Sequence, residues 1–355
     1  MASLDLQLAP EIAPVAPAKP PAKATSQLTF KTPSEAVPAP LPHGTTEAEA
    51  IDPPGEPCAS AAAGSELWLV STRSLPLGGD CCAPKFAPNV FRFICGAGFQ
   101  RATLAELIAD EEPDRPTIIY IHGNDNDPDD AAETGLDLYN RLLNSRCAQP
   151  IRLIVWSWPS EEVVKPVRQD ARIKACRTNI EGYFLAVFVD LLPAHIHVGI
   201  AGYSYGARVA TGGLHILGGG TLEGRRIGTR RHPDRDPLRC VLMAAAMDND
   251  WLLPGRPHDR AVSQVERMVI TISRTDHVLC FYPLLWGCGG PEALGVTGLI
   301  NAGSLGPDAM KIAHVDVTRA VHRRHAWNNF AEAPEVISLL RHELMHWPAT
   351  VAATP

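Results

Sequence analysis

Short, continuous apolar runs alternate along this chain with longer stretches of helical periodicity, and this alternation constrains the fold most. The runs are apolar throughout rather than at every second residue, which is typical of strands covered on both faces. We predict strands at ELWLVST (66–72), FRFIC (91–95), TIIYIHG (117–123), IRLIVWSW (151–158), IHVGIAGYS (196–204), CVLMAAAM (240–247), MVITIS (268–273) and MKIAHVDV (310–317). Strands that alternate with helices form a mainly parallel sheet, so the expected fold class is α/β, with eight strands and helices on both faces.

Three stretches between these strands carry helix signals at their ends. Residues 127–147 begin with acidic side chains and end with basic ones, which matches the helix dipole. Residues 161–192 form a long candidate helix after the fourth strand. Residues 205–220 follow the fifth strand and end in three glycines, a strong signal for the end of a helix.

The N-terminal segment has a different composition from the rest of the chain. Twelve of the 32 prolines fall within the first 57 residues, together with a single aromatic residue, Phe30. Such a segment cannot bury enough apolar surface to offset the conformational entropy lost on folding. We therefore predict a disordered or polyproline-like leader over residues 1–63 and one folded domain over residues 64–355.

The charge and cysteine content exclude some classes of protein. A formal net charge of −7 gives no broad basic field, which argues against nucleic acid as a partner, and we interpret the one basic cluster (224–239) as a solvated loop. There is no secretory signal pattern, and no apolar run reaches the roughly 18 residues that a membrane span needs. The nine cysteines are scattered without a C-x-x-C pair, which favours free thiols and hence a cytoplasmic location.

A serine stands where the fifth predicted strand passes into a helix, in the run AGYSYGARVATGG (201–213). The match to G-x-S-x-G is weak evidence by itself, because a helix-capping serine in a glycine-rich turn gives the same pattern. Its position adds weight: a strand-to-helix turn strains the backbone, and Gly202 and Gly206 leave room for it. This geometry would expose the hydroxyl of Ser204 at the carboxyl edge of the sheet, beside a helix N-terminus.

Other polar residues follow neighbouring strands and complete a possible site for nucleophilic catalysis. A serine nucleophile needs a base within hydrogen-bond reach, and the base needs a carboxylate that fixes its tautomer. Asp276 follows the seventh strand, and His322 and His325 follow the eighth, so the order is serine, acid, histidine. The backbone N–H groups of Tyr205 and of about Asn124 could form an oxyanion hole.

Several assignments stay open at this point. Asp248 and Asp250 in MDNDW are alternatives to Asp276 as the acid. We expect His122 to be a structural hydrogen-bonding residue rather than the base. The tryptophans at the end of the fourth strand, Trp156 and Trp158, either line an acyl pocket or, as we prefer, pack against the following helix.

The segments HGNDNDPDDA, VWSWPS, GYSYG, SRTDHVL and RRHAW occur in the order found in the bacterial α/β-hydrolase family of unknown function, and the chain resembles that family over about residues 66–345. The resemblance implies an α/β-hydrolase fold and hydrolysis of the ester or related acyl bond of a small-molecule substrate by a serine, with no metal or other cofactor. It also favours His325 over His322. Relatives usually carry H-S-M-G around the serine, whereas this chain has Tyr203 before it and Tyr205 after it, so pocket shape and substrate preference do not follow from the resemblance.

A rival motif stands near the C-terminus, where HELMH (342–346) matches H-E-x-x-H. Two histidines at i and i+4 share one face of a helix and could bind zinc, with Glu343 as general base of a peptidase. No third ligand follows, and the surrounding residues are typical of a final amphipathic helix. A third hypothesis is a hydrolase-fold scaffold without activity, whose proline-rich leader binds an unidentified protein.

Overall fold

The computed structural model describes residues 63–77, 84–109, 112, 115–144, 149–286 and 289–347. The predicted leader lies outside the described residues, except for residue 63. Within the described ranges, no helix combines the length and the apolar character needed to cross a membrane.

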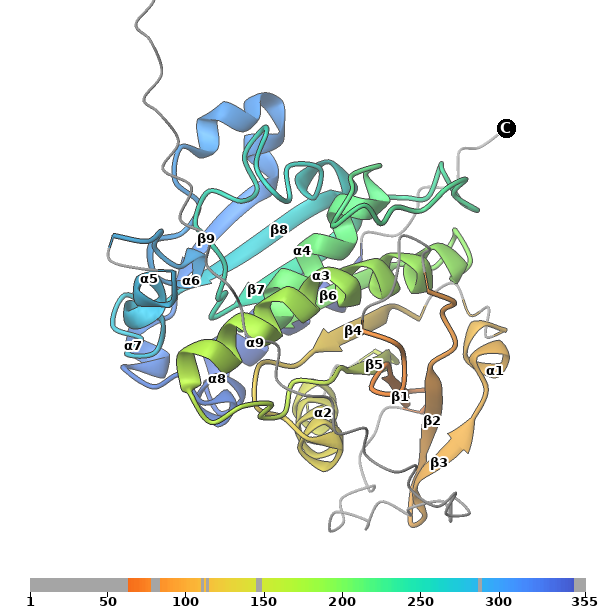
Figure 1. Cartoon of the computed structure of the whole chain (residues 1–355). Coiled ribbons are helices and arrows are strands. Elements are labelled where there is room, and N and C mark those ends of the chain that lie inside the picture. The colour runs from red at the N-terminus through yellow and green to blue at the C-terminus, as the bar shows by residue number, and fades with distance from the viewer. Residues whose placement is uncertain are drawn as a thin grey trace, which may run out of the picture. The chain divides into compact units, whose positions relative to one another are not determined.

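The described residues form one nine-stranded sheet with the order β3-β2-β1-β5-β4-β6-β7-β8-β9 (Figure 1). The strands are β1 (Glu66–Ser71), β2 (Asn89–Ile94), β3 (Gly98–Ala102), β4 (Thr117–Ile121), β5 (Arg152–Ser157), β6 (Val198–Tyr203), β7 (Leu238–Met243), β8 (Val265–Ile272) and β9 (Ile312–Asp316). Strand β2 pairs antiparallel with β1 and β3, and the other pairs are parallel. The predicted α/β class with a mainly parallel sheet is confirmed.

The predicted number of eight strands is wrong by one, because the edge strand β3 has no apolar run. Its residues GFQRA include exposed glutamine and arginine side chains, so this strand gives no apolar run. The seven other strands of the sheet's interior and β9 coincide with the predicted runs to within a few residues. The other edge strand, β9, carries an apolar run and was predicted, so it is the polar, exposed sequence of β3 that hid this strand.

Helices cover both faces of the sheet. They are α1 (Leu104–Ile108), α2 (Pro128–Leu143), α3 (Val167–Leu191), α4 (Gly206–Leu217), α5 (Tyr282–Leu285), α6 (Leu294–Thr297), α7 (Thr318–Val321), α8 (Trp327–Ala331) and α9 (Pro334–Leu344), with 3₁₀ helices at Val262–Gln264, Leu279–Phe281 and Ala302–Lys311. A side chain at Gly199 of β6 would meet Leu344 of α9, and one at Gly202 would meet Ala207 of α4. Because residues an odd number apart in a strand face opposite sides, α4 and α9 lie on opposite faces. Helix α3 packs along α4, in front of the sheet in Figure 1.

The three longest predicted helices exist, with shifted ends. Helix α2 begins after Asp127, whose side chain accepts hydrogen bonds from two backbone N–H groups of the first turn. Helix α3 begins only at Val167, later than predicted, because Pro166 interrupts the stretch. It then packs closely on α4, where a Cβ on Gly182 would lie 3.0 Å from the backbone of Gly212. Small residues thus allow the two helices to approach each other.

The strand order reverses direction at β4, which has β5 on one side and β6 on the other. In parallel α/β sheets the crevice outside the carboxyl ends of the strands at such a reversal is the usual ligand site. The loop after β4 and the turn after β6 meet at this point. The fold therefore places the predicted serine and the predicted His-Gly loop next to each other.

Among the described cysteines, Cys95 departs from the prediction of free thiols. Cys95 follows β2 and is disulfide-bonded, whereas Cys176, Cys240 and Cys280 are free. Linear spacing does not tell which cysteines meet in space, so the sequence alone could not identify this bond.

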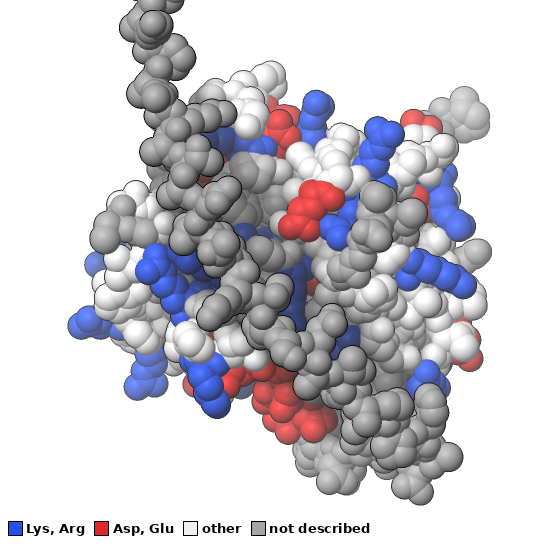
Figure 2. All heavy atoms as spheres, in the orientation of Figure 1, with Lys and Arg blue, Asp and Glu red and all other residues white. Residues whose placement is uncertain are grey.

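Charged side chains are mixed over the surface. Figure 2 shows Lys and Arg scattered over one face among acidic and uncharged residues. The basic segment 224–239 is a loop up to β7, as predicted, but it is not fully solvated: Arg235 is buried and donates hydrogen bonds to the carbonyls of Leu192 and Ile196. This arginine fastens the loop to the end of α3.

Candidate active site

Ser204 lies in a strained turn between β6 and α4. Its φ of 52° is in the left-handed region, which L-residues other than Gly, Asn and Asp rarely adopt. The glycines on either side are required by close backbone contacts: a Cβ on Gly206 would lie 2.1 Å from the carbonyl oxygen of Ile121, and one on Gly202 would lie 2.8 Å from that of Gly206. The turn thus holds the serine at the carboxyl edge of the sheet, as the sequence predicts.

The side chains of Ser204, His325 and Asp276 form one hydrogen-bonded row. His325 Nε2 lies 3.0 Å from Ser204 Oγ, and His325 Nδ1 lies 2.7 Å from Asp276 Oδ2. A carboxylate can only accept, so Nδ1–H donates to Asp276 and Nε2 is free to accept the serine proton. The structure therefore brings the three predicted residues together from positions up to 121 residues apart, in the arrangement that makes a serine hydroxyl nucleophilic.

Asp276 is fully buried and is fixed by the backbone that follows it. Its Oδ1 accepts hydrogen bonds of 3.0 Å from the N–H groups of Val278 and Leu279. Because Oδ1 is occupied in this way, Oδ2 points to the imidazole. The alternative acids have other partners: Asp248 accepts from the hydroxyl of Tyr282 at 2.7 Å, and Asp250 pairs with Arg256 at 2.9 Å.

The backbone around His325 is also held in place. The hydroxyl of Tyr203, the residue before the serine, donates to the carbonyl of His325, and the two rings lie 5.7 Å apart. His322 has a different place: its side chain is exposed, and its carbonyl accepts from the hydroxyls of Ser273 and Thr275. Of the two predicted histidines, only His325 reaches the serine.

The loop after β4 is built around a buried neutral histidine. His122 Nδ1–H donates to the carbonyl of Gly123 at 2.9 Å, and Nε2 accepts from the N–H of Trp158 at 3.2 Å. Burial lowers the pKa of His122 to about 3. His122 is thus a structural hydrogen-bonding residue, as predicted, and it ties the loop to the end of β5.

Two backbone N–H groups lie beside the serine without a partner in the described part of the chain. They belong to Tyr205, which caps α4, and to Asn124, in the loop after β4. Gly123 lets this loop come close, since a Cβ there would lie 3.1 Å from Ser204 Cβ. Both residues line the same cleft as Ser204, and their role as oxyanion donors stays a prediction.

The tryptophans at the end of β5 pack in the interior. Trp156 is fully buried, donates to Glu181 at 3.1 Å and lies 5.6 Å from the ring of Phe188 on α3. Trp158 is fully buried and donates to the carbonyl of His122 at 2.9 Å. The preferred prediction, packing against the following helix rather than lining a pocket, is confirmed for Trp156.

A cleft of about 740 Å³ opens over Ser204 and His325. Its polar lining comes from Asn124, Asp125, Asn126 and His277, and its apolar lining comes mainly from α3 and from residues 278–285. None of the described residues that line it is lysine or arginine. These apolar lining residues could not be predicted from the sequence, because single exposed hydrophobic residues in loops carry no periodic signal.

A buried lysine that the sequence analysis did not identify supports the polar side of the cleft. Lys174 of α3 is fully buried and forms ion pairs with Asp125 and, at 2.6 Å, with Asp170. Asp170 in turn accepts from the N–H groups of Val163 and Val164. Lys174 thereby bridges the two carboxylates and links the loop after β4 to α3.

The rival motif at residues 342–346 does not keep its two histidines on one helical face. Helix α9 ends at Leu344, so His346 lies beyond it and bonds to the carbonyl of Arg341 at 2.9 Å. The side chain of His342 is 78 % exposed, and Glu343 pairs with Arg267 at 2.8 Å. Within the described residues, no group of three or more His, Cys, Asp or Glu side chains could hold a metal ion.

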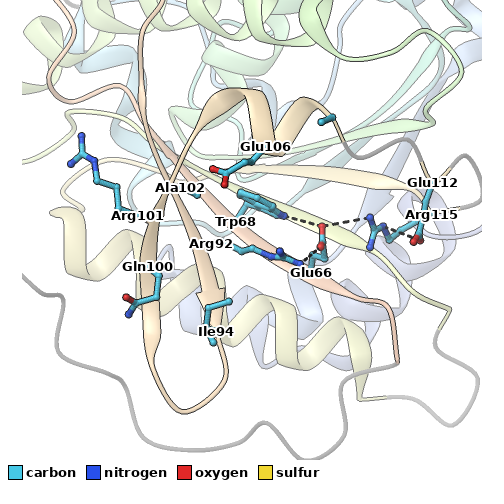
Figure 3. Close-up of a pocket in the computed structure, with 11 residues that line it drawn as sticks. Glu66, Trp68, Arg92, Ile94, Gln100, Arg101, Ala102, Glu106, Glu112 and Arg115 are labelled. Atoms are coloured by element: carbon cyan, nitrogen blue, oxygen red, sulfur yellow. Dashed lines mark hydrogen bonds and ion pairs between the residues drawn. The ribbon is translucent and has the colours of Figure 1, made fainter.

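A second pocket, of about 600 Å³, lies away from this edge, over β1 to β3 and α1. Figure 3 shows the side chains of Arg92 and Arg115 turned toward Glu66, which stands at the start of β1. Glu66 accepts from the indole N–H of Trp68 at 3.0 Å and pairs with Arg92 and with Arg115 at 3.5 Å. These groups satisfy each other, as expected for a structural cluster.

No family model matches this chain, and no curated protein matches it. Among solved structures it is similar to acyl-protein thioesterase 2 from Zea mays, with a TM-score of 0.38 and 14% sequence identity over 64% of this chain and 91% of that one. It is also similar to an acetylxylan esterase, with a TM-score of 0.33 and 10% identity over 64% of this chain and 98% of that one. The mainly parallel sheet, the serine turn after β6 and the helices on both faces agree with the predicted α/β-hydrolase fold.

Proposed function

We propose that this chain is a serine hydrolase that cleaves an ester or a related acyl bond through an acyl-enzyme intermediate. The observation that carries the proposal is the row of Ser204, His325 and Asp276, with hydrogen-bond distances of 3.0 and 2.7 Å. The left-handed φ of Ser204 supports it further, because such strain is characteristic of functional serines at strand-to-helix turns.

The proposed reaction has two halves. Ser204 Oγ bonds to the carbonyl carbon of the substrate while His325 Nε2 takes the hydroxyl proton, and the imidazolium then returns this proton to the departing alcohol or thiol. The acyl group stays on Ser204. A water molecule, deprotonated by His325, attacks the acyl group, the carboxylic acid leaves, and the serine regains its proton.

In this proposal Asp276 holds the Nδ1–H tautomer of His325 and stabilises the imidazolium that forms in each half. The N–H groups of Tyr205 and Asn124 stabilise the oxyanion of the tetrahedral intermediates. Each such donor contributes about 3 kcal/mol in enzymes of this kind. Their free N–H groups beside Ser204 support this role.

A cytoplasmic location stays a prediction. The disulfide of Cys95 weighs against it, because disulfides persist mainly in oxidising compartments. The activity assays should therefore first use protein in which the disulfide of Cys95 is intact.

A fluorophosphonate probe tests the proposal, because it bonds to an activated serine oxygen and releases fluoride. We expect the probe to label the wild type and not Ser204→Ala. Ser157→Ala is the matched control, since Ser157 is a second buried serine at the carboxyl end of a strand, β5, and its Oγ accepts from Arg73 rather than facing a histidine. Equal labelling of wild type and Ser204→Ala, or no labelling and no turnover of short esters by the wild type, would falsify the proposal; the second result would favour the scaffold hypothesis.

A further inference from the structure

Exposed apolar side chains gather around the cleft over Ser204. Among the described residues, nine large hydrophobic side chains are exposed. Val167, at 81 %, and Phe281, at 64 %, line the cleft together with Val278. Val163 lies shortly before Val167 in the chain, and Leu284 and Trp286 lie shortly after Phe281; all three are exposed, although they do not line the cleft. Exposed apolar surface is costly, and its concentration at one place marks a binding site for an apolar partner.

The two segments form the two walls of a groove. One wall is the start of α3, with Val167 and Ala171, and the other is residues 278–285, with Val278, Phe281 and Leu285. Arg168 and Arg172 of α3 donate to the carbonyl of Leu285 at 3.1 and 2.7 Å. These two bonds hold the walls at a fixed separation, so the groove is formed before a ligand binds.

The groove is continuous with the proposed nucleophile, because its walls and Ser204 line one cleft. No lysine or arginine lines the cleft among the described residues, and its one carboxylate there, Asp125, is exposed and forms an ion pair with Lys174, which does not line the cleft. Arg168 and Arg172, next to the groove, are held by the carbonyl of Leu285, and no charged side chain lines the apolar walls themselves among the described residues. An uncharged hydrocarbon chain would displace water from both of them.

We propose that the groove between α3 and residues 278–285 binds the hydrocarbon chain of a medium- or long-chain acyl group whose carbonyl is attacked by Ser204. The inference rests on the proposed function and specifies its substrate class. Each methylene buried in the groove favours binding about fourfold, so an octanoyl ester is preferred over an acetyl ester by at least about 10²-fold in kcat/KM.

The test is the kcat/KM of the full chain for the nitrophenyl esters of acetate, butyrate, octanoate and laurate. Wild type is compared with Val167→Ser/Phe281→Ser, in which two exposed side chains lose their apolar surface with little effect on folding. Met310→Ser is the matched control, because Met310 is 86 % exposed and lies outside the cleft, in the segment Ala302–Lys311. We expect the octanoate-to-acetate ratio to fall at least about tenfold in the double variant and to stay at the wild-type value in Met310→Ser.

Fluorophosphonate labelling of the same samples separates the two possible failures. A labelled wild type that hydrolyses acetate and octanoate equally well, or a double variant with an unchanged ratio, overturns the acyl-chain groove and leaves the hydrolase proposal standing. An unlabelled, inactive wild type overturns both.

Sedimentation velocity and flotation with phosphatidylcholine vesicles test whether something else binds the groove. If the double substitution abolishes self-association or vesicle binding while the octanoate-to-acetate ratio is unchanged, the apolar surface binds a second copy of the chain or a lipid surface instead of an acyl chain.

Discussion

Ser204 lies at the carboxyl end of strand β6, whereas the H-E-x-x-H run lies at the carboxyl end of helix α9. Around Ser204, loops from three other strands converge, and His325 and Asp276 arrive from sequence positions after β9 and β8. Around His342 the side chains face solvent or pair within the helix and with β8. The carboxyl ends of parallel strands bring residues that are distant in sequence to one edge of the sheet. The end of a surface helix such as α9 does not bring distant residues together in this way.

The comparison shows that the rarity of a sequence motif is a poor guide to its chemistry. H-E-x-x-H is the rarer pattern, and the helix that carries it ends before the second histidine. G-x-S-x-G is the commoner pattern, and the backbone contacts of Gly202 and Gly206 show why both glycines are needed. A motif gains chemical meaning from the elements that bring its partners to it.

Loss of the acid is expected to have the largest effect at the strand edge. In Asp276→Asn, the amide would favour the wrong tautomer of His325, so we expect kcat to fall by about 10⁴-fold with little loss of stability. Steady-state hydrolysis of a nitrophenyl ester, alongside thermal unfolding, measures both.

Asp248→Asn is the matched control for this variant, because Asp248 is bound to Tyr282 and not to His325. We expect its kcat to change by less than about tenfold. An active Asp276→Asn together with an inactive Asp248→Asn would move the acid to the segment after β7.

Much of the site at the carboxyl edge of the sheet was predictable from the sequence. Buried strands appear as apolar runs, and the residues that follow parallel strands lie at one edge of the sheet. The order of Ser204, Asp276 and His325 follows from that logic. The choice of Asp276 over Asp248 did not, because it depends on the N–H groups of Val278 and Leu279, which no pattern reveals. Exposed residues gave the weakest signals: the edge strand β3 and the cleft wall with Phe281 were both missed.

His122, a second histidine at the carboxyl edge of the sheet, is expected to affect the pH dependence of stability rather than activity. The pKa of His122 is lowered to about 3 in the folded chain, against about 6.5 when unfolded. Between these values the unfolded chain binds the additional proton, so the contribution of His122 to stability is complete above pH 6.5 and is lost as the pH falls towards 3. We expect a loss of about 2 kcal/mol between pH 6 and pH 4 from this group.

The measurement is denaturant unfolding of wild type and His122→Asn at several pH values. The difference in the free energy of unfolding between wild type and variant reports on His122 alone. It excludes the contribution of Glu181, because burial raises the pKa of this carboxyl to about 7 and its effect on stability has the opposite sign. A difference that is constant from pH 4 to pH 6 would contradict a neutral, buried His122.

The hydroxyl of Tyr203 is expected to have a smaller effect on activity. It donates to the carbonyl of His325, and its loss in Tyr203→Phe lets the histidine backbone move relative to the serine. We expect kcat and the rate of fluorophosphonate labelling to fall about tenfold, with a loss of about 1 kcal/mol in stability. Tyr139→Phe, which removes another buried tyrosine hydroxyl on α2, should show a stability change without the kinetic one.

The end of α9 should show the smallest effect of all. If zinc bound at His342 and His346, dialysis against a chelator would remove activity, added zinc would restore it, and His342→Ala would be inactive. Because His346 lies beyond the helix and Glu343 is engaged by Arg267, we expect all three treatments to leave kcat/KM within about twofold of the untreated wild type. Activity that is lost with the metal and restored by zinc would contradict this expectation. It would place the active site at the end of α9 and not at Ser204.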